Sequence, residues 1–117
     1  MQVYREILPN SYLVILVESA PAATDAGLLR SALRHASRSG KEQVWLDCSG
    51  LTTLSSDIVV MLTRYATQLR RRHASLVVCH PPVTAAGTSL EQVSAGTLLI
   101  ANTLLDAERV ALEAVSE

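Results

Sequence analysis

The sequence predicts an α/β fold, in which strands and helices alternate and the helices pack on one small sheet. Short apolar runs rich in Val, Ile and Leu are typical of buried strands, and they alternate with longer segments of helical periodicity. The chain has 117 residues, of which 49% are hydrophobic. This size and composition indicate one compact domain spanning residues 1–117.

A β-hairpin followed by a helix is predicted at the start of the chain. The apolar segments QVYREIL and YLVILV flank PNS, which is a turn signal between two strands. Residues 24–38 then carry leucines and alanines at helical spacing, and SRSGK ends the pattern. Thr24 or Asp25 provides the N-cap of this amphipathic helix.

A buried strand and a second helix come next. The run QVWLDC is too short for a helix and is predicted to lie parallel to the strand that precedes the first helix. From Asp57 onward, Ile58, Leu62, Tyr65 and Leu69 recur at steps of four, three and four. The basic residues 70–73 suit the C-terminal end of this helix, or form a partner-docking patch.

Two more strands and a final helix complete the prediction. SLVVC is a second buried strand that HPP interrupts, because proline lacks a backbone N–H. VTAAGTSLEQVSAG favours one or two short helices with loops, and TLLIAN a last strand. Thr103 and Asp106 have the spacing of a capping box, with Asp in place of Glu or Gln, and open a C-terminal helix.

Composition argues against nucleic acid and membrane partners. The formal net charge is -1 and the pI is about 6.3, so the overall balance does not favour a polyanion. The N-terminal residues MQVYREILPN lack a charged leader followed by an apolar run, and no apolar stretch approaches the roughly 18 residues that span a bilayer. We therefore expect a soluble, cytoplasmic protein without direct membrane insertion.

Motifs for catalysis or metal binding are missing from the sequence. It contains no G-x-S-x-G elbow, no phosphate-binding loop, no dinucleotide-binding turn and no H-E-x-x-H pair. Cys48 and Cys79 lie in strand-like runs and are expected to be buried thiols. Cys79 and His80 are adjacent on a predicted strand, on which their side chains are expected to point to opposite faces. We expect no enzyme, no cofactor and no metal site.

The polar junction before the second helix is the candidate site. Ser55, Ser56 and Asp57 stand between a buried strand and an amphipathic helix. Residues of these types cap helix N-termini, because a side-chain oxygen accepts an unpaired backbone N–H. A serine hydroxyl at a helix start is also well placed to carry a phosphate. Both interpretations are compatible with the sequence.

The order of these segments resembles the STAS family, the SpoIIAA-like anti-sigma factor antagonists of bacteria. The similarity rests on VWLDCSGLTTLSS, AATDAGLLRSALRHA, RYATQLRRRHASLVVC and LEQVSAGTLLIANTLLDAERVA, and covers nearly the whole chain. It implies a small mixed sheet that opens with a hairpin, with about four helices packed mainly on one side.

The resemblance also implies a function in transcription regulation. In that family the unphosphorylated antagonist captures an anti-sigma factor with serine-kinase activity, and phosphorylation of a helix-start serine releases it. The phosphoacceptor position falls on Ser56, with Ser55 where the family usually has Asp. In the register taken from the helix side, Ser55 and Ser56 form the serine pair. In the register taken from the strand side, Asp57 takes the place of the second serine, as a permanent negative charge.

Partner binding is expected at the same end of the molecule. The resemblance places the loop SAPAATD beside the serine turn, so Asp25 joins Ser55, Ser56 and Asp57 as a partner contact. Asp25 serves equally as a charge that complements the helix N-terminus. The alternative function is a non-switching accessory subunit of a transport complex or a scaffold of a signalling assembly. Homodimerisation is compatible with the sequence.

Overall fold

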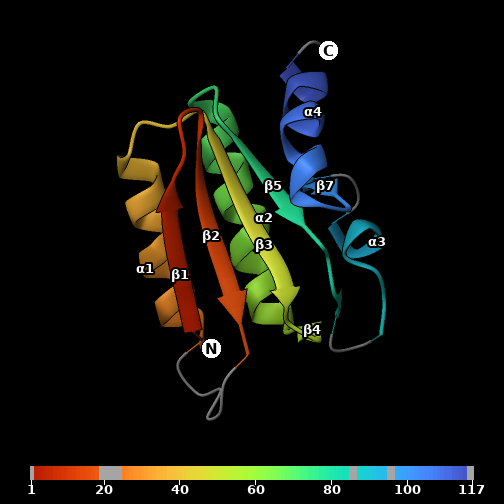
Figure 1. Cartoon of the computed structure of the whole chain (residues 1–117). Helices are drawn as coiled ribbons and strands as arrows, with labels where there is room; N and C mark the ends of the chain where they lie inside the picture. Colours follow the sequence, from red (N-terminus) through yellow and green to blue (C-terminus); the bar gives the residue numbers. More distant parts are fainter. Residues whose placement is uncertain (1, 19–24, 85–86, 95–96, 116–117) are drawn as a thin grey trace.

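Strands and helices alternate along the chain and build a mixed sheet in the computed structural model (Figure 1). The structure describes residues 2–18, 25–84, 87–94 and 97–115. Within these ranges, it describes the backbone but not the side chain of Asp25, Val93, Ala114 and Val115. The elements are β1 (Gln2–Ile7), β2 (Ser11–Val17), α1 (Asp25–Arg38), β3 (Gln43–Gly50), β4 (Thr53–Leu54), α2 (Ser56–Arg71), β5 (Ser75–Cys79), β6 (Val83–Thr84), α3 (Leu90–Ser94), β7 (Leu99–Ala101) and α4 (Leu104–Val115).

The main sheet has five strands in the order β1-β2-β3-β5-β7. β1 and β2 form the predicted antiparallel hairpin, and β2, β3, β5 and β7 run parallel. Val14, Leu46 and Val78 lie side by side on the three inner strands, and all three are fully buried. The prediction that the QVWLDC strand runs parallel to the strand before the first helix is confirmed.

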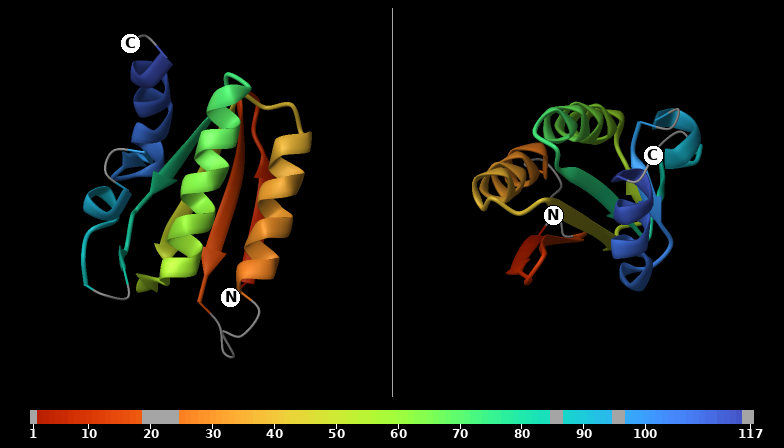
Figure 2. Two further views of the ribbon diagram at one scale, coloured as in Figure 1. Left: turned by 180° about the vertical axis from the view of Figure 1, so that it is seen from behind. Right: turned by 90° about the horizontal axis from the view of Figure 1, so that it is seen from above.

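Helices pack on both faces of the sheet, and on the second face they cover only the side of β5 and β7. α1 and α2 lie side by side over one face, and α4 lies on the opposite face (Figure 2). The larger core fills the space between the sheet and α1 and α2, with Leu29, Leu62 and Leu76 among its buried side chains. The predicted mixed α/β fold with four helices is confirmed for the described residues, and α4 is the helix that lies apart from α1 and α2.

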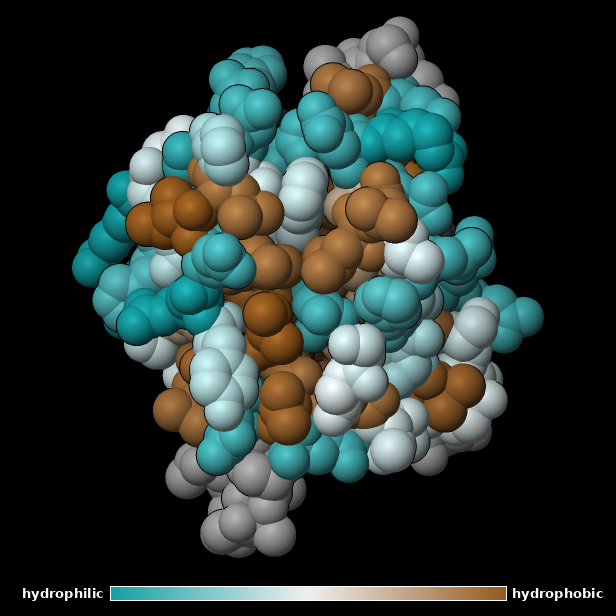
Figure 3. All heavy atoms as spheres, in the orientation of Figure 1, coloured by the Kyte–Doolittle hydropathy of each residue, from teal (hydrophilic) through white to brown (hydrophobic). Residues whose placement is uncertain are grey.

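The face that carries α4 has a smaller core made of small side chains. Ala107 and Ala111 of α4 pack against Val77, Cys79 and Ala101. The outer side of α4 is open to solvent, since Leu105 is 94% exposed. Hydrophobic spheres gather on this face over the middle of the sheet beside α4 (Figure 3).

Element boundaries follow the sequence prediction with small differences. α1 begins at Asp25, so Asp25 is its first helical residue and not its N-cap, and the other candidate cap, Thr24, lies outside the described residues. α2 begins at Ser56, one residue earlier than expected. A single short helix, α3, is described in the segment where one or two were expected. Before α4, the Thr103 hydroxyl donates to the Asp106 carboxylate at 3.1 Å.

Both cysteines are free and buried, as predicted. Burial is the main cause that raises the pKa of the Cys48 and Cys79 thiols to about 12, and the negative charge of Asp47 adds to it. The neutral thiol is therefore the favoured form at physiological pH.

Among the described residues, no helix is long and apolar enough to cross a membrane.

Candidate functional site

The candidate serines follow a short, anchored connection between β3 and α2. β4 comes directly before Ser55 and pairs in parallel with β6 in a small second sheet. Leu54 is 1% exposed and belongs to the larger core. Pairing on one side and burial on the other therefore fix the backbone that delivers the serines to the start of α2.

Ser55 is the N-cap of α2. Its backbone is extended, with φ -71° and ψ 158°, and its hydroxyl oxygen accepts the backbone N–H of Ile58 at 3.4 Å. Its carbonyl accepts the N–H of Val59 at 3.1 Å, which closes the first turn of the helix. The capping role foreseen for this junction thus belongs to Ser55.

Ser56 and Asp57 occupy the first turn of α2 and are exposed. The Ser56 hydroxyl forms no hydrogen bond with the part of the chain that the structure describes. The Asp57 carboxylate lies where a negative charge complements the helix dipole. The Ser55 hydroxyl is therefore engaged in the cap, whereas the exposed Ser56 hydroxyl is accessible to a partner or a modifying enzyme.

The division of labour between the two serines predicts unequal effects of alanine substitution. Ser55→Ala should lower the free energy of unfolding by about 0.5–2 kcal/mol, because one N–H of the first turn loses its acceptor. Ser56→Ala should change it by less than about 0.5 kcal/mol, since an exposed side chain without contacts is removed. Urea unfolding followed by circular dichroism measures both values. Equal losses would contradict the assignment of Ser55 as N-cap.

The end of β2 is tied to the turn that precedes the serines. The Glu18 backbone N–H donates to the Gly50 carbonyl at 3.0 Å, and the Glu18 carboxylate accepts both the N–H and the hydroxyl of Thr52 at 2.6 Å. The bond from the Thr52 side chain is the main cause that lowers the pKa of Glu18. These bonds hold the exits of β2 and β3 together beside the start of α2.

Three of the four predicted contact residues, Ser55, Ser56 and Asp57, are consecutive at the start of α2. For the fourth, Asp25, only the position of the backbone is described. α1 and α2 start at the same end of the sheet (Figure 1), so the Asp25 backbone lies at the end that carries Ser55, Ser56 and Asp57. Its side chain is outside what the structure describes. Its role as a partner contact therefore stays a prediction.

The sequence analysis missed a basic groove between α1 and α2. It has a volume of about 840 Å³ and is lined by five arginines and one carboxylate, that of Asp57. The arginines are Arg30, Arg34 and Arg38 on α1, Arg64 on α2, and Arg72 at the end of α2. Their spacing of four and eight residues is visible in the sequence, but the sequence alone does not show that two helices present them to one groove.

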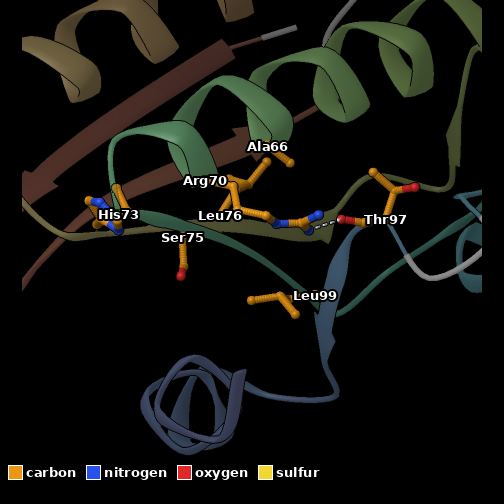
Figure 4. Close-up of a pocket in the computed structure, with 8 residues that line it drawn as sticks. Ala66, Arg70, His73, Ser75, Leu76, Thr97 and Leu99 are labelled. Atoms are coloured by element: carbon orange, nitrogen blue, oxygen red, sulfur yellow. Dashed lines mark hydrogen bonds between the residues drawn. The ribbon is translucent and has the colours of Figure 1, made fainter. Parts of the chain in front are cut away.

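A smaller pocket of about 260 Å³ lies at the far end of α2 (Figure 4). Arg70 reaches across it and donates to the Thr97 carbonyl at 2.9 Å. Arg72 donates to the Ser37 carbonyl at 3.3 Å. Arg70 and Arg72 thus bind backbone carbonyls of neighbouring segments, which supports a structural role for these two side chains at the helix end.

Among the described residues, no group of three or more His, Cys, Asp and Glu side chains is arranged to hold a metal ion.

Comparison with known proteins gives matches at the level of family and fold. A family model described as "Mlab, STAS domain" matches residues 13–100. The protein TM1081, solved by NMR, has a TM-score of 0.72 at 8% sequence identity, with 92% of this chain and 86% of that chain covered. A serine-to-glutamate variant of RsbS from Moorella thermoacetica has a TM-score of 0.71 at 10% identity, with 100% of both chains covered. No curated protein matches this chain.

Proposed function

Because this chain belongs to the STAS domain family, we propose that it is an anti-sigma factor antagonist, a cytoplasmic protein-binding switch that acts as one domain. It captures an anti-sigma factor with serine-kinase activity, and that partner phosphorylates Ser56 and is released. The observation that carries the proposal is the exposed Ser56 hydroxyl, which stands in the first turn of α2 and is spared from capping by Ser55.

Phosphorylation at this position would act on the partner more than on the fold. The first turn of a helix offers unpaired N–H groups and the positive end of the dipole, so the domain tolerates a phosphate there. The added charge of about -1.5 to -2 would repel an acidic partner surface and keep it from close contact. The unmodified hydroxyl is small enough to permit that contact.

The connection to β2 supports a continuous binding surface. The hydrogen bonds between Glu18 and Thr52 fix the turn before Ser55 relative to the exit of β2. We propose that Asp25, Ser55, Ser56 and Asp57 contact the partner together, since α1 and α2 begin at the same end of the sheet.

The test is phosphate transfer and capture by candidate anti-sigma kinases from the same genome. After incubation with kinase, ATP and magnesium, intact-mass spectrometry should show one added phosphate, which site mapping places on Ser56. Ser55→Ala, the matched control, should still be modified, whereas Ser56→Ala should not. Ser56→Glu should bind the kinase at least about tenfold more weakly than wild type, through added negative charge, with unchanged thermal stability.

One observation favours a second candidate function. Asp57 is an exposed carboxylate in the first turn of α2 and provides a permanent charge beside the serines. A fixed charge would suit a non-switching accessory subunit of a transport complex or a scaffold. Stable capture of a kinase without phosphate transfer would indicate a constitutive binder. Absence of both capture and transfer would contradict the antagonist and favour the accessory role.

A further inference from the structure

The groove between α1 and α2 concentrates positive charge on a protein whose net charge is -1. Five of its ten Lys and Arg residues line this one groove. Their side chains are all exposed, and within the described residues none of them forms an ion pair. Such a surface attracts a partner with complementary negative charge.

The groove walls are fixed before any partner arrives. The Tyr65 hydroxyl donates to the Leu33 carbonyl at 2.9 Å and accepts the Ser37 hydroxyl at 3.0 Å. Because Tyr65 belongs to α2 and the other two residues to α1, these bonds set the position of the two helices relative to each other. A preformed groove spares a ligand the entropic cost of ordering it.

The three arginines of α1 lie one turn apart along one face of that helix. Arg30, Arg34 and Arg38 follow at intervals of four residues, which corresponds to about 6 Å along α1. Carboxylates one turn apart on a second helix have the same spacing. Arginine also binds a carboxylate with two parallel hydrogen bonds, which gives direction to the contact.

Apolar side chains form part of the same lining. Met61 is partly exposed in it, and Val60 is 49% exposed. A partner that brings apolar residues beside its carboxylates would cover this surface, as an amphipathic helix does in a hydrophobic groove.

We propose that the groove between α1 and α2 binds an acidic amphipathic helix of a protein partner. Nucleic acid fits the lining less well, because its aromatic residue, Tyr65, is 8% exposed and offers no face for base stacking. The proposal goes beyond the serine switch and does not depend on phosphorylation of Ser56, which is absent from the groove lining.

Fluorescence anisotropy with a dye-labelled synthetic helix tests the proposal on the whole chain. The peptide carries glutamates one turn apart along one face and leucines beside them. Binding is expected, with affinity that falls as salt rises. A peptide with glutamine for every glutamate should lose binding through loss of charge, and one with serine for every leucine should bind more weakly.

Charge reversal locates the peptide. Arg34→Glu with Arg64→Glu should weaken binding at least about tenfold, because two attractive contacts become repulsive. The matched control, Arg5→Glu with Arg71→Glu, changes the net charge equally at exposed residues outside the groove lining. All four arginines are exposed, so circular dichroism should show both double variants folded.

Three outcomes would overturn the proposal. The first is no binding of the acidic peptide to the folded wild type. The second is equal loss of affinity in the groove and control variants, which would mean nonspecific attraction. The third is tighter binding of a single-stranded oligonucleotide or of phosphatidylserine vesicles than of the peptide. The assay contains neither kinase nor ATP, so its result is independent of the serine switch.

Discussion

Gly50→Ala is expected to lower the free energy of unfolding by about 3 kcal/mol. A Cβ atom at this position would lie 2.7 Å from the Leu16 carbonyl oxygen and 3.1 Å from the Val17 Cα. Both are backbone atoms of β2, so relief requires the two strands to move apart. Gly50 also accepts the N–H of Glu18, and the movement would disturb that bond at the exit of β2.

Gly27→Ala provides the matched control for this substitution. Gly27 lies inside α1, and an added Cβ there would meet nothing within 4 Å. Alanine has the higher helix propensity, so this variant should gain about 0.5–1 kcal/mol. Urea unfolding gives both values. A neutral Gly50→Ala variant would mean that β2 and β3 can separate at this point without cost.

Alkaline pH is expected to destabilise the protein through its buried thiols. The pKa of Cys48 and of Cys79 is raised from 9.0 to about 12 in the folded state. Below pH 9 the thiols are protonated in both the folded and the unfolded state, so their contribution to the free energy of unfolding does not change with pH. Between pH 9 and 12 only the folded state keeps the thiol protons. The free energy of unfolding should therefore fall by roughly 1 kcal/mol per pH unit for each thiol.

The slope of stability against pH separates the thiols from other groups. Burial also raises the pKa of Tyr65, which adds to the loss in the wild type and in any cysteine variant alike. A Cys48→Ala, Cys79→Ala variant should start less stable, because each substitution leaves a small cavity, yet lose stability more slowly as pH rises. Urea unfolding at a series of pH values measures both slopes. Identical slopes would show that the thiols do not control alkaline unfolding.

The five strands of the main sheet and the two long helices were predictable because their signals are local, whereas the short strands β4 and β6 lie in segments that were predicted as a turn and as short helices with loops. The run SYLVILV of β2 is buried over most of its length, and the periodic residues of α2 face the larger core. The placement of α4 has no local signal. The described residues contain no strand after α4 to which the handedness rule for crossovers could be applied, so that rule does not fix its face.

The two features of the site that the sequence left open depend on geometry beyond residue type. Ser55 and Ser56 are equally good caps by type, and the extended backbone of Ser55 decides between them. Predicting the groove would have required the knowledge that the arginine-bearing faces of α1 and α2 meet. That contact depends on the strand order and on the hydrogen bonds of Tyr65. Asp25, whose side chain is not described, stays a prediction.

Because α4 lies on the face of the sheet opposite α1 and α2, it can carry a covalent label away from the candidate surfaces. Leu105 belongs to this helix, and its side chain is 94% exposed. Both native thiols are buried and protonated at neutral pH, so an alkylating dye would react selectively with a cysteine introduced by Leu105→Cys. The domain can thus be made fluorescent, or tethered to a sensor chip, without removing its own cysteines, and with the start of α2 and the groove facing the solution.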